Sequence, residues 1–262
     1  MTTKTTERGV DDLTVANSTC SPKPPPDRLY GRARGHKLRA RQERLLEVTL
    51  PRIAFAAEQA GAPLSAFGEG AREVWLEVGF GGGEHALVQI AAHPQTGLIA
   101  CEVFENGICS LLSRLVPEGG EADAPLPPNL RLWRGDARHL IGNLPPASLD
   151  RLFLLFPDPW PKARHAKRRF LHPALLPTIA GAMKPEAEWR IATDDPTYQG
   201  WVAQVMSSQT WFAADGLATI TRPPDWPPTR YEAKALRDGR TPKYWSFRRT
   251  GSQATDPSDA AT

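Results

Sequence analysis

Cysteine is scarce in this chain of 262 residues, and no apolar run approaches the roughly 20 residues needed to cross a bilayer. The three cysteines, Cys20, Cys101 and Cys109, form no CxxC pair and do not cluster with histidines at metal-ligand spacing. The first residues are polar and charged, and they lack the apolar stretch of a secretory signal. We therefore expect a cytoplasmic protein that has no disulfide framework, binds no metal and enters no membrane.

Aromatic residues are missing from residues 1–27, which end in a proline-rich run. Such a composition cannot bury enough apolar surface to offset the conformational entropy that is lost on ordering. Residues 251–262 are similarly small and polar. We expect a disordered leader over 1–27, one folded domain over 28–250 and a disordered tail over 251–262.

The net charge is only +3, but the positive charge is concentrated near the start of the predicted domain. Residues 28–44 contain one acid, Glu43. The cations of this basic segment are Arg28, Arg32, Arg34, Lys37, Arg39, Arg41 and Arg44. Residues 69–123, by contrast, are dominated by acids, with Arg72 and Arg114 as their only cations. A segment this basic is typical of contact with nucleic-acid phosphates.

Short apolar runs alternate with segments that have apolar residues at helical spacing. The expected strands are 73–78, 98–103, 130–133, 151–156 and 188–192, and the expected helices are 84–92, 105–115 and 173–183. This alternation predicts βαβ units on a parallel sheet, and therefore a Rossmann-like, doubly wound α/β fold. In such folds ligands bind beyond the carboxyl ends of the strands, so the residues that follow each strand are the candidates for a site.

A glycine-rich loop follows the first expected strand and leads into the first helix. Gly79 and Gly81 allow the backbone to turn sharply and to approach a ligand closely. A dinucleotide-binding loop needs a third glycine in the GxGxxG pattern, and Glu84 occupies that position. The loop therefore disfavours NAD, although a glycine-rich turn of purely structural function stays an open alternative.

Acidic residues stand at the ends of three successive expected strands: Glu77, Glu102 and Asp136. S-adenosylmethionine has an ammonium group that can pair with an acid and ribose hydroxyls that need an acceptor. It has no pyrophosphate to place on a helix N-terminus. This combination favours S-adenosylmethionine as the ligand, with Asp136 as a candidate acceptor for the adenine amino group.

The fourth expected strand runs into a loop in which Asp158 lies between two prolines. Proline restricts the backbone of its own residue and of the residue before it, so the carboxylate is held on a stiff loop. Trp160 could stack on a base, and the cations that follow could contact phosphates: Lys162, Arg164, Lys167, Arg168 and Arg169. The structural alternative is a proline-braced turn followed by a solvated basic face.

Taken together, these motifs resemble the bacterial tRNA (guanine-N7)-methyltransferases of the TrmB type. The resemblance covers the whole predicted domain, and the run Phe-Pro-Asp-Pro-Trp-Pro-Lys-Ala-Arg-His from residue 156 is its most specific part. It also rests on residues 30–39, 77–85, 192–194 and 229–235. The leader, the tail and the connection 117–128 fall outside the pattern.

The resemblance implies transfer of a methyl group from S-adenosylmethionine to N7 of guanine-46 in the variable loop of tRNA. It makes Glu77, Glu102, Asp136 and Asp158 contacts of the cofactor, with Asp158 also as the catalytic residue. It implies the following substrate contacts: Lys162, Asp194, Thr229, Arg230, Tyr231 and Glu232.

The chemistry of guanine agrees with this implication. N7 carries a free lone pair, so it needs no general base, and a carboxylate such as Asp158 could orient it and stabilise the charge that develops. Binding would draw on phosphate contacts from the basic segment, from the cations after Trp160 and from Arg237, Arg240, Lys243, Arg248 and Arg249. A methyltransferase with another acceptor and a non-catalytic RNA-binding subunit stay as alternatives.

Overall fold

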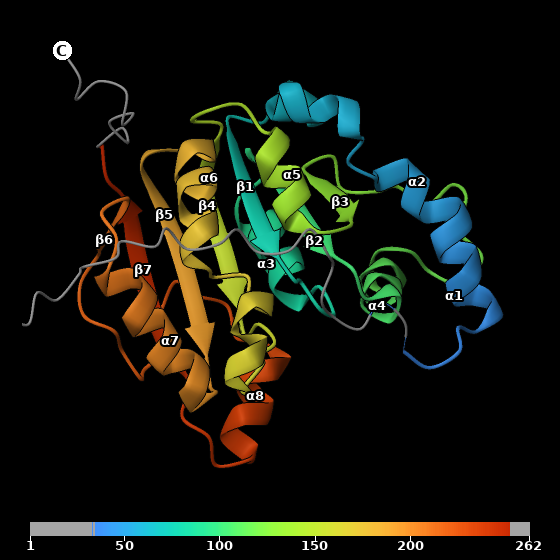
Figure 1. Cartoon of the computed structure of the whole chain (residues 1–262). Helices are drawn as coiled ribbons and strands as arrows, with labels where there is room; N and C mark the ends of the chain where they lie inside the picture. Colours follow the sequence, from blue (N-terminus) through green and yellow to red (C-terminus); the bar gives the residue numbers. More distant parts are fainter. Residues whose placement is uncertain (1–32, 34, 252–262) are drawn as a thin grey trace, which may run out of the picture.

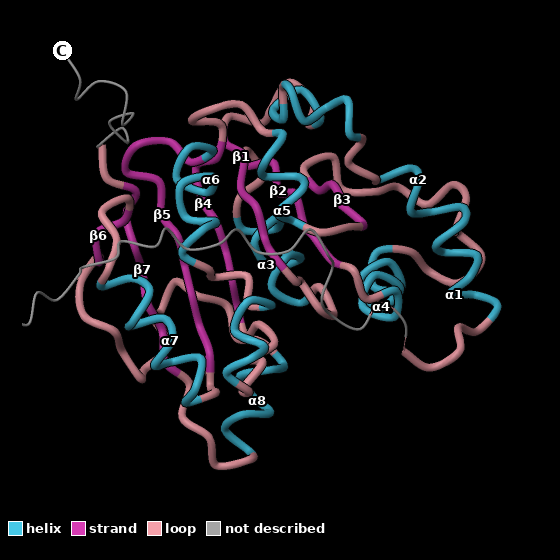
Figure 2. The backbone as a smooth tube through the Cα atoms, viewed as in Figure 1, coloured by secondary structure: helices cyan, strands magenta, loops and turns pink. Residues whose placement is uncertain are grey.

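The computed structural model describes Ala33 and residues 35–251, so the predicted leader and nearly all of the predicted tail lie outside the described residues. The described residues form a central sheet with helices on both of its faces, as Figures 1 and 2 show. None of the helices in this part of the chain is long and apolar enough to cross a membrane.

The central sheet has seven strands in the order β3-β2-β1-β4-β5-β7-β6. Strands β1 to β5 run parallel to one another, which confirms the doubly wound α/β fold. All of them overlap the ranges predicted from the sequence. The strands are β1 (Glu73–Val78), β2 (Thr96–Glu102), β3 (Leu130–Arg134), β4 (Leu149–Leu155), β5 (Met183–Thr193), β6 (Phe212–Ala214) and β7 (Lys243–Arg249).

Two C-terminal strands, which the sequence analysis did not predict, make the sheet mixed. Strand β7 pairs antiparallel with β5, and β6 pairs antiparallel with β7. Trp245 and Phe247 of β7 pack on one face of the sheet, whereas Ser246 and Arg248 lie on the other. Cations at both ends of β7 obscure this alternation in the sequence, so the segment resembles a basic tail.

Helices cover both faces of the sheet. Helices α5 (Ala137–Asn143), α6 (Leu176–Ala182) and α7 (Pro196–Ser207) pack on one face, in a core that includes Leu76, Leu152 and Trp189. Helices α3 (Glu84–Ala92) and α4 (Glu105–Leu115) pack on the other face, against Trp75 and Phe153. Adjacent strand residues point to opposite faces, so Trp75 and Leu76 belong to different cores.

The predicted bounds of α3 and α4 are confirmed, whereas the predicted helix over 173–183 is shorter. A 3₁₀ turn (Pro173–Leu175) precedes α6, and Met183 already belongs to β5. The remaining helical elements are α1 (Ala40–Arg44), a π turn (Leu45–Thr49), α2 (Leu50–Ile53), 3₁₀ turns (Ala57–Gly61, Pro63–Ala66 and Ala163–Arg168) and α8 (Arg230–Arg237).

The connection 117–128, which the motif analysis leaves without a role, holds the N-terminal helices on the domain. Glu121 is buried and pairs with Arg41, whose Nη2 also donates to the carbonyl of Val116 at 2.7 Å. The hydroxyl of Thr49 and the guanidinium of Arg52 donate to the Glu121 carbonyl. Arg41 therefore serves the fold, and the prediction that it contacts phosphate is corrected.

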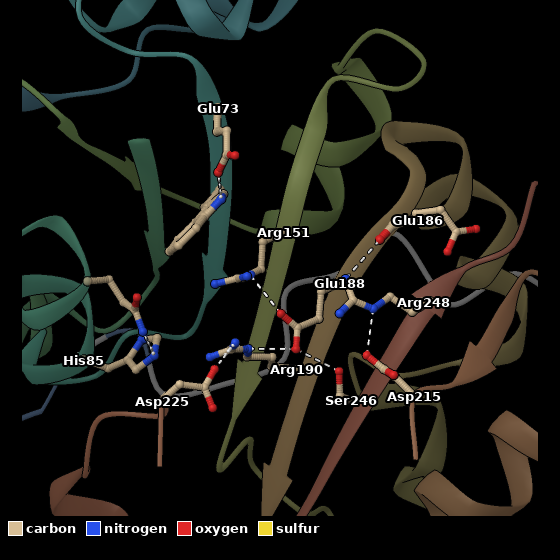
Figure 3. A network of polar contacts seen from close by, with 12 residues as sticks. Glu73, His85, Arg151, Glu186, Glu188, Arg190, Asp215, Asp225, Ser246 and Arg248 are labelled. Atoms are coloured by element: carbon tan, nitrogen blue, oxygen red, sulfur yellow. Dashed lines mark hydrogen bonds and ion pairs between the residues drawn. The ribbon is translucent and has the colours of Figure 1, made fainter. Parts of the chain in front are cut away.

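Charged side chains of β4 and β5 lie on the sheet face beside α3. Figure 3 shows Glu188 between two arginines: its carboxylate is 3.0 Å from Arg151 Nε and 3.0 Å from Arg190 Nε. Arg190 also pairs with Asp225 at 2.5 Å and lies over the ring of Trp226. These buried charges are thus paired, and they fasten the segment that leads into α8 to the sheet.

Gly83 is a position where the fold requires glycine. Its φ is 81°, and a Cβ there would lie 2.5 Å from Cδ1 of Leu111 in α4. We expect Gly83→Ala to lower the free energy of unfolding by about 3 kcal/mol, because it adds backbone strain to overpacking. Gly142→Ala, in α5 with open space at Cβ, is the matched control and should change it by less than about 1 kcal/mol. Urea denaturation measures both; equal effects of the two substitutions would contradict the prediction.

Candidate active site

A cavity of about 320 Å³ lies where the parallel strands end. Its walls come from the β1–α3 loop, from the ends of β2, β3 and β4, and from the start of α8. The predicted site residues among its lining are Gly79, Gly81, Glu102, Asp136, Asp158 and Tyr231. Other side chains in the lining are Phe104, Arg138, Phe156, Trp160, Arg168 and Phe170. Over Ala33 and residues 35–251, no group of three or more His, Cys, Asp or Glu side chains could hold a metal ion.

The glycine loop is tied to the end of β2 through Glu102. The backbone N–H of Gly81 donates to Glu102 Oε2 at 2.8 Å, and the N–H groups of Val103 and Phe104 donate to Oε1. Gly81 has a φ of 58°, and Gly107 of α4 approaches its carbonyl so closely that a Cβ would lie 2.5 Å from the oxygen. The loop is therefore held between α4 and a carboxylate.

Burial raises the pKa of Glu102 above its ordinary value. The three N–H donors oppose this rise, and the charge of Asp158 adds to it. Oε1 accepts two of these hydrogen bonds and Oε2 only one, so Oε2 keeps a lone pair that can accept a hydrogen bond from a ligand hydroxyl. Glu102 can therefore bind a hydroxyl at the rim of the cavity while it holds the loop.

Asp136 caps the N-terminus of α5, where its Oδ1 accepts from the backbone N–H of Arg138 at 2.9 Å. The guanidinium of Arg138 returns to the same carboxylate, with Nε 2.9 Å from Oδ2. Both oxygens of Asp136 thus have a partner, and Arg138 adds a positive charge to the cavity wall. The sequence analysis did not predict this arginine.

Glu77 lies behind the glycine loop and is not among the residues that line the cavity. Its carboxylate is buried and lies 3.0 Å from Nδ1 of His85 in α3. The ring of His85 packs edge-on against Phe153, and its Nε2 is 3.1 Å from the side chain of Gln89. The structure therefore shows Glu77 as an anchor between β1 and α3.

Asp158 stands on a loop whose ends have unusual backbone conformations. Phe156 has a φ of 50° and Trp160 a φ of 44°, in the left-handed region that bulky residues rarely adopt. The Phe156 N–H donates to the Ala192 carbonyl at 2.7 Å and so holds the start of the loop. Within the described part of the chain, the exposed carboxylate of Asp158 has no hydrogen-bond or ion-pair partner. It is free to meet a ligand in the cavity.

The ring of Trp160 already has neighbours on two sides. The guanidinium carbon of Arg168 lies 4.8 Å from its centroid, and His165 contacts it edge-on at 5.9 Å. The arrangement favours a packed cavity wall over a free platform for a base.

The start of α8 is fixed by a buried carboxylate. Thr229 and Glu232 form a capping box, in which Thr229 Oγ1 accepts from the Glu232 N–H at 3.0 Å. Glu232 also accepts from Arg222 Nε at 3.0 Å and from the hydroxyl of Tyr244 at 2.8 Å. Burial and the neighbouring Glu232 carboxylate raise the pKa of Tyr244.

This anchoring places Tyr231 over the glycine loop. A Cβ added to Gly81 would lie 2.8 Å from the Tyr231 ring, so the ring contacts the loop directly. Arg230 donates to the Tyr231 hydroxyl at 3.1 Å. In Figure 1, the arrow of β5 points toward α8, which therefore borders the carboxyl edge of the sheet.

The basic segment reaches the same edge. The N–H of Glu105, at the start of α4, donates to the carbonyl of Ala33 at 3.0 Å. The side chain of Asn106 accepts from the N–H of Gly35 and donates to the carbonyl of His36. Phe104, next to these residues, lines the cavity, so the basic segment runs beside it.

Comparisons with known proteins agree with this geometry. Residues 71–244 match a protein family described as "Putative methyltransferase". A protein from Granulibacter bethesdensis named tRNA (guanine-N(7)-)-methyltransferase is 62% identical over 85% of this chain and 95% of its own length. The chain belongs to the tRNA (guanine-N7)-methyltransferase family. Proteins of the same name from Rhodospirillum rubrum and Paracoccus denitrificans are 42% and 44% identical over 89% and 88% of this chain, and 92% and 99% of their own lengths.

Solved structures resemble the chain more distantly. The 16S rRNA methyltransferase KamB aligns over 69% of this chain and 89% of its own, at 16% identity and a TM-score of 0.49. The family assignment rests on the sequence relatives alone.

Within this methyltransferase family member, most of the predicted cofactor contacts lie together at the cavity. Gly79, Gly81, Glu102, Asp136 and Asp158 line it, and Glu77 does not. The signal that could have placed Glu77 is the pairing of an acid at a strand end with a histidine one residue after the start of the next helix.

The predicted substrate contacts are more dispersed. Tyr231 lines the cavity, Arg230 lies next to it, and Lys162 is exposed at the start of the 3₁₀ turn Ala163–Arg168. Asp194 pairs with Arg240. Thr229 and Glu232 are occupied by the capping box, and the Glu232 side chain is buried.

Several cations that were predicted to contact phosphate are engaged inside the molecule. Arg169 is buried and donates to backbone carbonyls, so its predicted phosphate contact is corrected. Arg240 pairs with Asp194 and Asp238, and Arg248 pairs with Asp215. Arg249 donates to the carbonyl of Ala180. The sequence shows their charge but not their partners, several of which, such as Asp194 and Asp215, are distant along the chain.

Proposed function

We propose that this protein transfers the methyl group of S-adenosylmethionine to N7 of a guanine in tRNA, at guanine-46 of the variable loop, in the cytoplasm. The observation that carries the proposal is the carboxylate of Asp158, which lies beside Glu102 in the cavity at the strand ends and has no partner among the residues that the structure describes. Family membership supports the reaction class, because the relatives are named for this activity.

The cavity fits S-adenosylmethionine by the chemistry of its lining. Glu102 Oε2 can accept from a ribose hydroxyl, and the absence of a Cβ at Gly79 and Gly81 leaves the glycine loop open to close approach. Apolar side chains such as Phe104 and Phe170 provide surfaces against which an adenine can pack. When bound, this group supplies an electrophilic methyl on a sulfonium.

The residues of the chain then have to position the guanine and tolerate the charge it gains. N7 has a free lone pair, so no side chain needs to remove a proton. Methylation leaves a positive charge on the imidazole ring, and the fixed carboxylate of Asp158 stabilises that charge without reorganising. N7 faces the deep groove of an A-form helix, which side chains cannot read, so the target lies in an irregular region such as the variable loop.

The exposed face of α8 offers a track for the tRNA backbone. Arg230, Lys234 and Arg237 are spaced four and three residues apart, which places them on one side of the helix. This stripe starts next to Tyr231 at the cavity rim. Three cations in a row on a helix that borders the site are well placed to contact successive phosphates.

The first experiment measures transfer of labelled methyl to unmodified tRNA transcripts, followed by chemical cleavage at 7-methylguanosine. We expect a single cleavage at guanine-46, and none in a transcript with adenine at that position.

Asp158→Asn should lower the rate of methyl transfer by at least about a hundredfold with little change in affinity for the cofactor. Label without cleavage would refute N7 as the acceptor. Tight tRNA binding without any transfer would favour a non-catalytic binding protein, and a near-normal rate for Asp158→Asn would refute the catalytic role of Asp158.

A second prediction concerns Glu102 and pH. Binding of S-adenosylmethionine, measured by calorimetry between about pH 8 and pH 5, should weaken as the pH falls, because protonation removes an acceptor. The weakening should begin above the pH range of an ordinary glutamate, since burial raises the pKa of Glu102. A raised folded-state pKa means that the carboxylate costs stability at neutral pH and that this cost disappears on acidification, so its protonation does not itself unfold the protein.

The matched variants separate Glu102 from a general effect of charge. Glu102→Gln should bind the cofactor at least about tenfold more weakly and lose most of the pH dependence. Glu118→Gln, at an exposed position outside the cavity, should behave as the wild type. An unchanged affinity for Glu102→Gln would remove Glu102 from the cofactor site.

The third prediction concerns the stripe on α8. The double substitution Lys234→Ala and Arg237→Ala should weaken tRNA binding and make the slope of log Kd against log salt concentration shallower by about one for each cation removed. Arg72→Ala is the control, because this exposed cation directly precedes β1 at the opposite edge of the sheet. Equal salt slopes for the stripe variant and the wild type would exclude α8 from the tRNA interface.

A further inference from the structure

Arg169 contacts the loop that carries Asp158 from inside the protein. Its Nε donates to the carbonyl of Pro159 at 2.9 Å, and its Nη2 donates to the carbonyl of Trp160 at 3.0 Å. These two carbonyls belong to the residues that directly follow Asp158. Two nitrogens of one guanidinium therefore hold the backbone that directly follows Asp158.

The burial of Arg169 needs an explanation, because it is a charged residue with an exposed fraction of only 5%. Among the described residues, no carboxylate lies within ion-pair distance of it. Instead, its guanidinium carbon lies 4.7 Å from the centroid of the Trp201 ring and 6.0 Å from that of Tyr198. Burial lowers the pKa of Arg169, and the negative ends of Tyr198 and Asp195 oppose this shift. Among the described residues, the two carbonyls are its hydrogen-bonding partners, and these bonds offset part of the cost of burying the charge.

The loop needs such support because its conformation is strained at both ends. Phe156 and Trp160 have positive φ angles of 50° and 44°, which cost energy for aromatic residues. Proline at 157, 159 and 161 removes backbone N–H donors, so the loop cannot hold itself in place by a ladder of its own. A bidentate donor from outside can fix two adjacent carbonyls at once, and among side chains only arginine has that fork.

We infer that Arg169 is a positioning residue for methyl transfer, which fixes the loop 156–160 so that the carboxylate of Asp158 stands in the cavity. The inference rests on the proposed role of Asp158. It gives a reason why the cations after Trp160 act differently: Lys162, Arg164 and Lys167 are exposed, whereas Arg169 is turned inward. It also predicts that Arg169 acts on the rate through Asp158 and not through contact with tRNA.

The test is a double-mutant cycle on Arg169 and Asp158, read as single-turnover methyl transfer to tRNA. Arg169→Lys keeps the charge but cannot span both carbonyls. We expect it to slow transfer by at least about tenfold, with the Kd values for S-adenosylmethionine and tRNA within about twofold of wild type. In the Asp158→Asn background, the same substitution should cause no further loss beyond about twofold.

Arg131→Lys is the matched control. Arg131 also donates to two backbone carbonyls, those of Pro128 and Leu130, and lies over the ring of Phe67, but it is absent from the cavity lining. Its substitution should leave the transfer rate unchanged. Thermal unfolding shows whether each variant is folded at the assay temperature. Should Arg169→Lys unfold, Arg169→Gln, which keeps one donor, takes its place in the cycle.

Each outcome has one meaning. Losses that multiply in the double variant, or a weaker tRNA affinity that accounts for the slower rate, would overturn the inference in favour of an independent role or a phosphate contact. A wild-type rate for Arg169→Lys, with Asp158→Asn slow, would overturn the inference alone. A wild-type rate for Asp158→Asn would overturn the proposed role of Asp158, and the inference with it.

Discussion

The site depends on the hydrogen bonds that Glu102 accepts from three backbone N–H groups. They join the glycine loop after β1 to the end of β2, and so convert two neighbouring strand ends into one rigid wall of the cavity. Parallel pairing makes this possible, because only parallel neighbours bring their carboxyl ends to the same edge. The arrangement keeps a carboxylate buried at a cost in stability, which is visible in its raised pKa. Ligand-binding groups are commonly kept at a cost in the stability of the fold, because the charge that destabilises the fold is the charge that a ligand can contact.

A second feature is that buried charged side chains hold α8 and the segment before it in place. Glu232 is buried and holds the start of α8, which presents Tyr231 to the glycine loop. Arg190 is buried and holds Asp225, in the segment before α8. In each case a buried charged side chain forms hydrogen bonds or ion pairs with side chains of a neighbouring segment, and it holds that segment in place. The buried charges of Glu232 and Arg190 are thus explained by the segments that they fix.

Much of the fold could be predicted from the sequence, because the spacing of apolar residues and the positions of the strand ends depend only on residues that are close along the chain. The bounds of α3 and α4 and the five parallel strands follow from apolar spacing, and the acids after these strands had to gather at one edge. Side-chain direction could not be predicted in the same way. Glu77 turns to His85 in α3, and Glu232 turns to Tyr244 in β7, because a partner in another element decides which way each carboxylate points, and apolar spacing does not show that partner. The antiparallel β7 was hidden for a related reason, since its cations pair with residues such as Asp215 that no local pattern connects to it.

The same reasoning explains why Asp158, alone among the acids that line the cavity, has no partner among the described residues. Glu77, Asp136 and Glu232 all lie at strand or helix ends too, and each contacts a histidine or an arginine nearby. Asp158 is flanked by prolines, which donate no N–H, and by residues whose left-handed backbone turns them away from the regular ladder. Its support comes from Arg169 through the backbone and not through the carboxylate itself. In the proposed reaction, a carboxylate that is held firmly by its main chain and has no partner among the described residues can stabilise the positive charge that forms when a neutral ring nitrogen is methylated.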